Sequence, residues 1–320
     1  MLVSSALWAG LVACGGTEEA APPPAAPALA APGADEGAAR RERRGKRADR
    51  RGGGSELTPI GELPSVSDPC AAWERPGLYT VTVPFGGRET PTLVYIPDKA
   101  GPRRMAVLLH GGSGAPSDVM DQTGILRIAD QHGIVVVGPQ GGGGSKDGNW
   151  NPRDAAPGAR DDVRYLDLVV ENLKPRTCSR QVLGMGFSNG AMMAMRWLCQ
   201  GTTPDAAVTG SGRMGVPVNS CRSPRPIRSY VGTADDHYST EHPTTPESLD
   251  MWAEVNRCNG RAREAKSGRI TERAWAGCRA STQQFVIEGF PHAWPKPGAK
   301  GDAPVDATVD SWRWFADVVP

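Results

Sequence analysis

The sequence has almost no net charge, no metal-binding cysteine pattern and no long apolar segment, and each lack excludes a class of function. Its 36 basic and 35 acidic side chains give a formal charge of +1, so we expect no nucleic acid partner. None of the seven cysteines forms a CxxC pair, and no Cys/His cluster predicts a metal site. The apolar stretch at residues 1–13 is too short to span a bilayer. Seven cysteines without metal-binding spacing favour an exported protein with disulfides.

The first residues resemble an export signal. Residues 11–14 are Leu-Val-Ala-Cys, followed by two glycines, which is similar to the lipobox of a bacterial lipoprotein signal peptide. This resemblance implies that residues 1–14 are a signal peptide, that Cys14 is lipidated, and that the protein meets the membrane only through that anchor. Residues 1–13 contain no Lys or Arg, which a signal peptide normally carries, so an ordinary secretion signal with an incidental cysteine is the alternative.

Residues 15–67 have the composition of a spacer. They are rich in Ala and Pro, then basic over residues 40–51, then rich in Gly, Ser and Pro. Such a segment buries too little apolar surface to offset the entropy of ordering. We therefore predict a disordered tether over 15–67 and a catalytic domain over 68–320. The basic run could contact anionic lipid or wall polymer, although a solvated spacer is the simpler interpretation.

Residues 68–320 alternate short apolar runs with amphipathic ones, which predicts an α/β fold with a mostly parallel sheet and helices on both faces. The first two strands alternate as an antiparallel pair and the others are continuous apolar runs typical of buried parallel strands. The predicted strands are 78–83, 92–96, 104–109, 134–138, 181–185, 206–210, 227–231 and 284–287. The predicted helices are 117–131, one from Asp161 or Asp162 to Pro175, 189–200, 246–258 and 306–318.

Residues 186–190, Gly-Phe-Ser-Asn-Gly, connect a predicted strand to a predicted helix. Because Gly186 and Gly190 have no Cβ, strand and helix can approach closely there. Ser188 is left at the tip of the turn with the positive end of the helix behind it. The motif alone is weak, and a serine in a structural turn is the alternative. Its setting between strand and helix indicates a nucleophile.

A serine nucleophile needs a base and a carboxylate that orients the base. On this architecture they follow the serine in the order acid, then histidine, each after the end of a strand. Asp235 follows the strand 227–231 and His292 follows the strand 284–287. Asp236 is the alternative acid, but Asp235 comes sooner after the strand, where the backbone is better fixed.

The remaining histidines fit other roles. His237 and His242 lie in a polar segment beside the acid and are expected on the surface. His110 begins the glycine-rich segment 110–114 and is expected to shape it.

The segment 110–114 follows a buried strand, and its backbone N–H groups can face a developing oxyanion. We expect donors from Asn189 and from the Gly112/Ser113 region. This chemistry needs no metal and no organic cofactor. Trp150, in the long segment 140–160, is a candidate substrate contact, with a packing role as the alternative.

Five motifs resemble one family of α/β-hydrolases, which groups polyhydroxybutyrate depolymerase-like esterases with secreted feruloyl and acetylxylan esterases. They are His110-Gly111-Gly112-Ser113-Gly114, residues 161–166, residues 186–193, Gly232-Thr233-Ala234-Asp235 and His292-Ala293-Trp294-Pro295. The resemblance covers about residues 80–315 and implies an α/β-hydrolase fold with the triad Ser188, Asp235 and His292. We take Trp294, in the last motif, as a second candidate substrate contact. Asp236-His237 departs from the family, which often has apolar residues and a proline there.

Apart from Cys14, six cysteines remain and allow fifteen pairings. Cys258 and Cys278 flank a polar, Arg-rich segment, a region that similar proteins often close with a disulfide. Cys199 could meet Cys221, which would pair Cys70 with Cys178. Reduced, buried thiols are the alternative for these last two pairs.

Together these features predict an exported serine esterase that forms an acyl-enzyme. The expected substrate is a feruloyl or acetyl ester on polysaccharide, or a small soluble ester. A short-chain polyhydroxyalkanoate depolymerase is the first alternative, although the chain has no room for the separate polymer-binding module that such extracellular enzymes usually add. A non-catalytic surface binding protein on a hydrolase scaffold is the alternative from another class, and a peptidase is a third.

Overall fold

The computed structural model describes residues 58–142, 148–153, 159–298 and 300–320. The chain divides into two units, residues 1–54 and 55–320. The predicted signal peptide, Cys14 and the part of the predicted tether before residue 58 lie outside the described residues.

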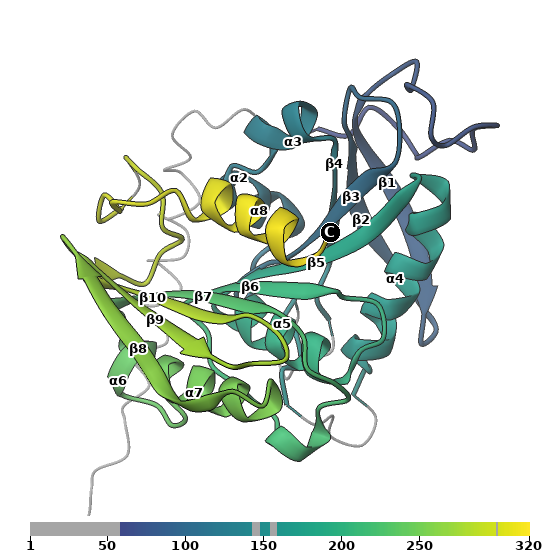
Figure 1. Cartoon of the computed structure of the whole chain (residues 1–320). Coiled ribbons are helices and arrows are strands. Elements are labelled where there is room, and N and C mark those ends of the chain that lie inside the picture. The colour runs from purple at the N-terminus through teal and green to yellow at the C-terminus, as the bar shows by residue number, and fades with distance from the viewer. Residues whose placement is uncertain (1–57, 143–147, 154–158, 299) are drawn as a thin grey trace, which may run out of the picture. The chain divides into compact units, whose positions relative to one another are not determined.

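A ten-stranded sheet forms the centre of the second unit (Figure 1), in the order β1-β2-β4-β3-β5-β6-β7-β10-β9-β8. The neighbouring strands from β4 to β10 run parallel, and the strands outside them are antiparallel. This confirms the predicted α/β-hydrolase fold. The strands are β1 (Gly77–Phe85), β2 (Arg88–Ile96), β3 (Arg103–Leu109), β4 (Ile134–Pro139), β5 (Ser179–Phe187), β6 (Ala206–Gly210), β7 (Ile227–Ala234), β8 (Asn259–Ser267), β9 (Ile270–Ala276) and β10 (Thr282–Pro291).

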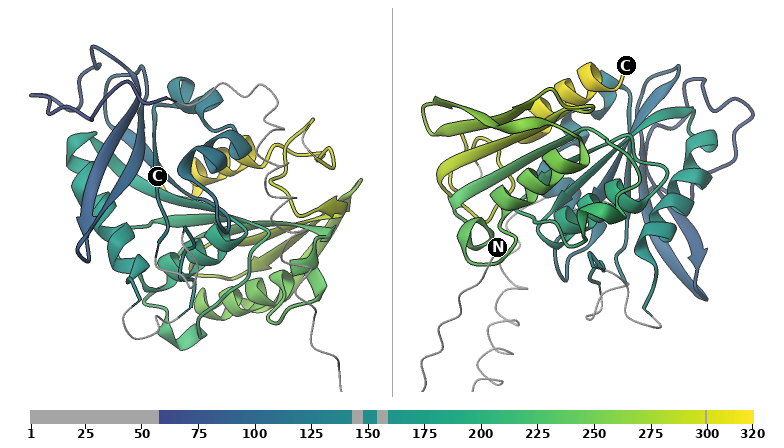
Figure 2. Two further views of the ribbon diagram at one scale, coloured as in Figure 1. Left: turned by 180° about the vertical axis from the view of Figure 1, so that it is seen from behind. Right: turned by 60° about the horizontal axis from the view of Figure 1, so that its bottom comes forward.

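Helices cover both faces of the sheet (Figures 1 and 2). Because side chains alternate along a strand, Val107 and Leu109 pack with α4 and α5 while Ala106 and Leu108 pack with α2, α3 and α8. Within the described ranges no helix has the length and apolar character needed to cross a membrane. The helices are α2 (Pro116–Thr123), α3 (Leu126–His132), α4 (Asp162–Arg176), α5 (Asn189–Gln200), α6 (Asp236–Ser239), α7 (Thr245–Val255) and α8 (Ala307–Val318), with a 3-10 turn at Val218–Ser220.

The helix predicted over 117–131 is two helices. Gly124 ends α2 with φ of 63°, a left-handed conformation that glycine adopts without steric cost. Ser117 lies inside α2, and Ala115 occupies the N-cap position predicted for the serine. In α4, Asp161 is the N-cap, as one of the two predicted starts, and the helix continues one residue beyond Pro175.

The folded region begins earlier than residue 68. The N–H groups of Ile60 and Leu63 donate to carbonyl groups of β1, at 2.8 and 3.0 Å, and Thr80 of β1 donates to Gly61 at 2.9 Å. Leu63 is buried in the core. Residues 60–63, assigned to the tether from composition, therefore cover the outer edge of β1.

Residues 259–276 form a hairpin, β8–β9, which extends the sheet beyond β10. The sequence predicts only a polar segment there. Eight of the nine residues of β8 are exposed, and the charged ones include Arg261, Arg263, Glu264 and Lys266. Such a strand gains its pairing from the backbone and has no apolar face that a pattern search can find.

Three disulfides join the same cysteines that the sequence favours. They are Cys70–Cys178, Cys199–Cys221 and Cys258–Cys278, and they close 108, 22 and 20 residues of sequence, respectively.

Candidate active site

Ser188 lies at a sharp turn between β5 and α5. Its φ of 55° and ψ of −120° are unusual for a residue with a side chain and are typical of a strained nucleophile turn. The turn depends on its two glycines. A Cβ on Gly186 would lie 2.2 Å from the carbonyl oxygen of Gly190, and a Cβ on Gly190 would lie 2.0 Å from that of Leu109. The sequence therefore folds locally into a turn that only glycine at both positions permits.

Asp235 and His292 lie side by side because β7 and β10 are parallel neighbours. Ala234 pairs with Pro291, after an irregularity in β10 between Ile287 and Pro291. The next residue on each strand is the acid and the histidine. Nδ1 of His292 is 3.0 Å from each carboxylate oxygen of Asp235. The structure thus brings these two predicted residues together at the carboxyl edge of the sheet.

The carboxylate of Asp235 is buried, with 2% of the residue exposed. Burial raises the pKa of this carboxylate. Hydrogen bonds from His292, the Ser211 side chain and the backbone N–H of His237 outweigh that effect and hold the pKa below its usual value. The group therefore stays ionised at neutral pH and can hold a proton on Nδ1 of His292. The alternative acid, Asp236, is exposed in the first turn of α6.

The imidazole of His292 contacts two other rings. Its centroid is 4.8 Å from that of Phe187, the residue before Ser188, and 5.1 Å from that of His237. The side chain remains 37% exposed, which leaves it open to solvent or substrate. His237 is therefore not simply a surface residue, as expected, but a neighbour of His292. His242 is exposed, as the sequence predicts.

The glycine-rich segment 110–114 lies against the serine turn. A Cβ on Gly111 would be 3.6 Å from Cβ of Ser188, and one on Gly112 would be 3.9 Å from Cβ of Asn189. As the first residue of α5, Asn189 has an N–H with no carbonyl partner inside the helix. The N–H of Gly112 likewise has no acceptor within the described part of the chain.

Ser113 does not offer the oxyanion donor that the sequence analysis expects from the Gly112/Ser113 region. Its N–H donates to Oδ1 of Asn149 at 2.6 Å and is not available to an oxyanion. The predicted donor region therefore reduces to Gly112. Asn149 is a residue that sequence reasoning missed, because nothing in its local sequence indicates a contact with a residue 36 positions away.

His110 shapes this segment, in agreement with its predicted role. It is fully buried, and Nε2 accepts a hydrogen bond from the N–H of Gly141 at 2.9 Å while Nδ1 lies 2.8 Å from the carbonyl oxygen of Gly111. Burial lowers the pKa of the imidazole. The ring is therefore neutral, with its proton on Nδ1.

The two tryptophans predicted as substrate contacts are both buried, each 1% exposed. Nε1 of Trp150 donates to the carbonyl oxygen of His110 at 3.1 Å, and Nε1 of Trp294 donates to Oγ1 of Thr308 at 3.0 Å. An indole whose N–H finds an acceptor inside the protein packs well there. The packing alternative thus holds for Trp150, and Trp294 is corrected in the same way.

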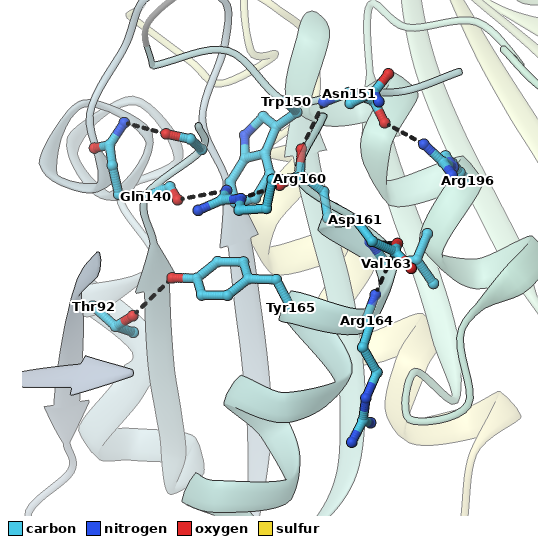
Figure 3. A network of polar contacts seen from close by, with 12 residues as sticks. Thr92, Gln140, Trp150, Asn151, Arg160, Asp161, Val163, Arg164, Tyr165 and Arg196 are labelled. Atoms are coloured by element: carbon cyan, nitrogen blue, oxygen red, sulfur yellow. Dashed lines mark hydrogen bonds and ion pairs between the residues drawn. The ribbon is translucent and has the colours of Figure 1, made fainter. Parts of the chain in front are cut away.

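A buried ion pair formed by Arg160 fixes the segment that carries Asn149 and Trp150. Figure 3 shows Trp150 beside Arg160. Nε of Arg160 is 2.6 Å from Oδ1 of Asp162, whose other oxygen accepts the N–H of Asn151 at 2.7 Å. From the other side, Arg196 donates to the carbonyl oxygen of Asn151 at 2.8 Å. Burial raises the pKa of Asp162, and Arg160 and the N–H of Asn151 oppose that rise. The sequence predicts Asp162 only as part of a helix start.

No group of three or more His, Cys, Asp or Glu side chains in the described ranges is arranged to hold a metal ion. A serine at a strained turn, an imidazole bound to a buried carboxylate, and adjacent backbone N–H groups are the elements of nucleophilic acyl transfer.

The chain is similar in sequence to known esterases, although no model of a known protein family matches it. NocK of Nocardia uniformis subsp. tsuyamanensis, whose name assigns it to the esterases, is 26% identical over 226 residues, which are 60% of this chain and 66% of NocK. The bifunctional acetylxylan esterase/xylanase XynS20E of Neocallimastix patriciarum is 28% identical over 147 residues, 45% of this chain and 21% of that protein. The chain thus spans just under two thirds of the first relative and about a fifth of the second.

A solved structure shares the fold. An acetyl xylan esterase from Aspergillus awamori superposes with a TM-score of 0.58 at 16% identity, over 75% of this chain and 99% of that one. At this identity the likeness concerns the fold alone.

Proposed function

We propose that the chain is a serine esterase of the α/β-hydrolase fold, with the triad Ser188, His292 and Asp235. The observation that carries the proposal is the pair formed by His292 and the buried Asp235, with Nδ1 3.0 Å from both carboxylate oxygens. The ring contact between His292 and Phe187 sets that pair against the turn that carries Ser188. A buried carboxylate that stays ionised beside a partly exposed imidazole is an arrangement that orients a catalytic base.

In the proposed reaction, Asp235 holds the proton of His292 on Nδ1, so that the lone pair of Nε2 takes the proton of the Ser188 hydroxyl. The serine oxygen attacks the ester carbonyl, and the N–H groups of Asn189 and Gly112 stabilise the oxyanion. Collapse of the tetrahedral intermediate breaks the bond to the alcohol, which takes the proton from His292. Water, deprotonated by His292, then hydrolyses the acyl-enzyme and restores the serine.

We further propose that the enzyme is exported and acts on acetyl or feruloyl esters of polysaccharide, or on small soluble esters. The sequence relative XynS20E is named as an acetylxylan esterase/xylanase, which supports the substrate class. Three disulfides support an oxidising compartment. Attachment through a lipid on Cys14 belongs to the same proposal. The alternatives remain a short-chain polyhydroxyalkanoate depolymerase and a non-catalytic surface binding protein.

A fluorophosphonate probe tests the proposal on the full chain. We expect labelling of the wild-type protein and none of the Ser188→Ala variant, with loss of p-nitrophenyl acetate hydrolysis in parallel. Rates on acetylated xylan, methyl ferulate and a hydroxybutyrate oligomer then separate the substrate classes. A protein that retains polysaccharide but is neither labelled nor active would instead be the binding protein.

A further inference from the structure

Asn149 lies where it can shape the oxyanion hole without touching the substrate oxygen. Its Oδ1 accepts the N–H of Ser113 at 2.6 Å and would lie 3.5 Å from a Cβ on Gly112. We propose that Asn149 is a positioning residue: by binding the N–H of Ser113, it fixes the peptide between Gly112 and Ser113 and leaves the N–H of Gly112 as the donor that this segment offers. This inference rests on the proposed esterase function.

The backbone of Ser113 needs such a restraint. Its φ of 57° is in the left-handed region, which disfavours a residue with a side chain. If the N–H lost its acceptor, Ser113 would relax towards a common conformation. The angle φ of Ser113 is the rotation about its N–Cα bond, which adjoins the peptide between Gly112 and Ser113. A change in this angle would therefore turn that peptide and move the backbone of Gly112 with it. A shift of this kind moves an oxyanion donor out of line without unfolding the domain.

The neighbour of Asn149 is bound directly to the residue after the nucleophile. The N–H of Trp150 donates to Oδ1 of Asn189 at 2.8 Å, and Nδ2 of Asn189 donates to the carbonyl oxygen of Trp150 at 3.3 Å. Two hydrogen bonds in opposite directions fix the distance between this segment and the start of α5. The N–H of Asn189 is the other proposed oxyanion donor, so both donors are held to one short segment.

Asn151, two residues after Asn149, provides a matched control. Its backbone N–H and carbonyl oxygen bind Asp162 and Arg196, whereas its side chain makes no hydrogen bond within the described part of the chain. Removing the side chain of Asn151 therefore leaves the segment in place, and removing that of Asn149 releases Ser113. The two variants change the same residue type two positions apart.

The experiment compares Asn149→Ala and Asn151→Ala with wild type in the full chain. Loss of a whole oxyanion donor costs about 10² to 10³ in rate, so a displaced donor should lower kcat about 10- to 100-fold. We expect KM to change less than about twofold, because a donor aimed at the oxyanion acts in the transition state. The affinity of a trifluoromethyl ketone, which forms a tetrahedral adduct, should fall by the same factor as kcat/KM. Asn151→Ala should keep all three values.

Asn149→Leu, which has a similar size but no acceptor, repeats the test if the alanine variant does not fold. Unchanged kcat in a folded variant at position 149 overturns the inference, and so does a raised KM with unchanged kcat. An equal loss in Asn151→Ala also overturns it, because the effect would belong to the segment and not to the Asn149 amide. If the wild-type protein shows no hydrolysis that is lost in Ser188→Ala, the proposed function is wrong, and this inference is wrong with it.

Discussion

Replacing Asp235 by Asn removes one charge and almost no volume from a buried position in the candidate site. Nδ1 of His292 is equally distant from both carboxylate oxygens, and the N–H of His237 donates to Oδ1 at 2.9 Å. An asparagine must keep an oxygen for His237, so its NH₂ takes the place of Oδ2. That NH₂ then faces Nδ1 and opposes a proton there. The imidazole would carry its proton on Nε2 and could not act as the base.

The loss expected from this change is about 10³- to 10⁴-fold in kcat/KM, which corresponds to about 4 to 5.5 kcal/mol in the barrier. The serine turn and the oxyanion donors remain, so some catalysis above the uncatalysed rate should persist. Initial rates with p-nitrophenyl acetate measure the effect, and the thermal unfolding midpoint checks that the variant is folded.

Asp236→Asn is the control, because Asp236 is the neighbouring exposed carboxylate and the alternative acid in the sequence. We expect its kcat/KM to stay within about twofold of wild type. Retention of more than a tenth of the wild-type rate in Asp235→Asn would refute the role assigned to Asp235. A comparable loss in Asp236→Asn would show that the geometry selects the wrong acid.

Two further changes test the packing and charge that support the site. Gly190→Ala should yield little folded protein, because the new Cβ would lie 2.0 Å from the carbonyl oxygen of Leu109; a normal yield with an unchanged unfolding midpoint would contradict this. Asp167 is buried, which raises its pKa, but hydrogen bonds from Thr203 and Trp197 lower the pKa below its usual value. Its ionised form therefore stabilises the fold above about pH 4, and Asp167→Asn should lower the free energy of unfolding by about 2 kcal/mol at pH 7. Urea denaturation should show that the difference in the free energy of unfolding between wild type and Asp167→Asn narrows as the pH falls through the lowered pKa of Asp167. A constant difference from pH 7 to pH 3 would contradict the stabilising role of the ionised carboxylate.

The sequence predicts the parallel centre of the fold and the pairing of acid and base for the same reason. Continuous apolar runs indicate strands buried on both faces, and the ends of parallel strands meet at one edge. Asp235 and His292 each follow such a run, so their contact in the structure follows from strand order. The same reasoning prefers Asp235 to Asp236, since backbone order falls with distance from the strand.

Features that depend on single long-range contacts could not be predicted. Asn149 and Asp162 act through partners that the sequence does not reveal, and neither lies in a pattern with a period. Trp150 is a candidate substrate contact in the sequence because it lies in the long segment 140–160, and Trp294 because it lies in the last motif. In the structure both indoles pack inside the protein and donate to internal acceptors. The composition of residues 58–67 resembles that of the spacer before it, so neither their backbone hydrogen bonds to β1 nor the burial of Leu63 could be predicted from the sequence.

The two borders of the sheet discourage self-association by different means. Along β1, the chain's own residues 60–63 already occupy backbone groups that a second molecule would otherwise bind. Along β8, the arginine and lysine side chains would have to lose water and approach their copies before another molecule could align its strand. The covered part of β1 and the charged strand β8 are therefore poor templates for edge-to-edge pairing with another molecule.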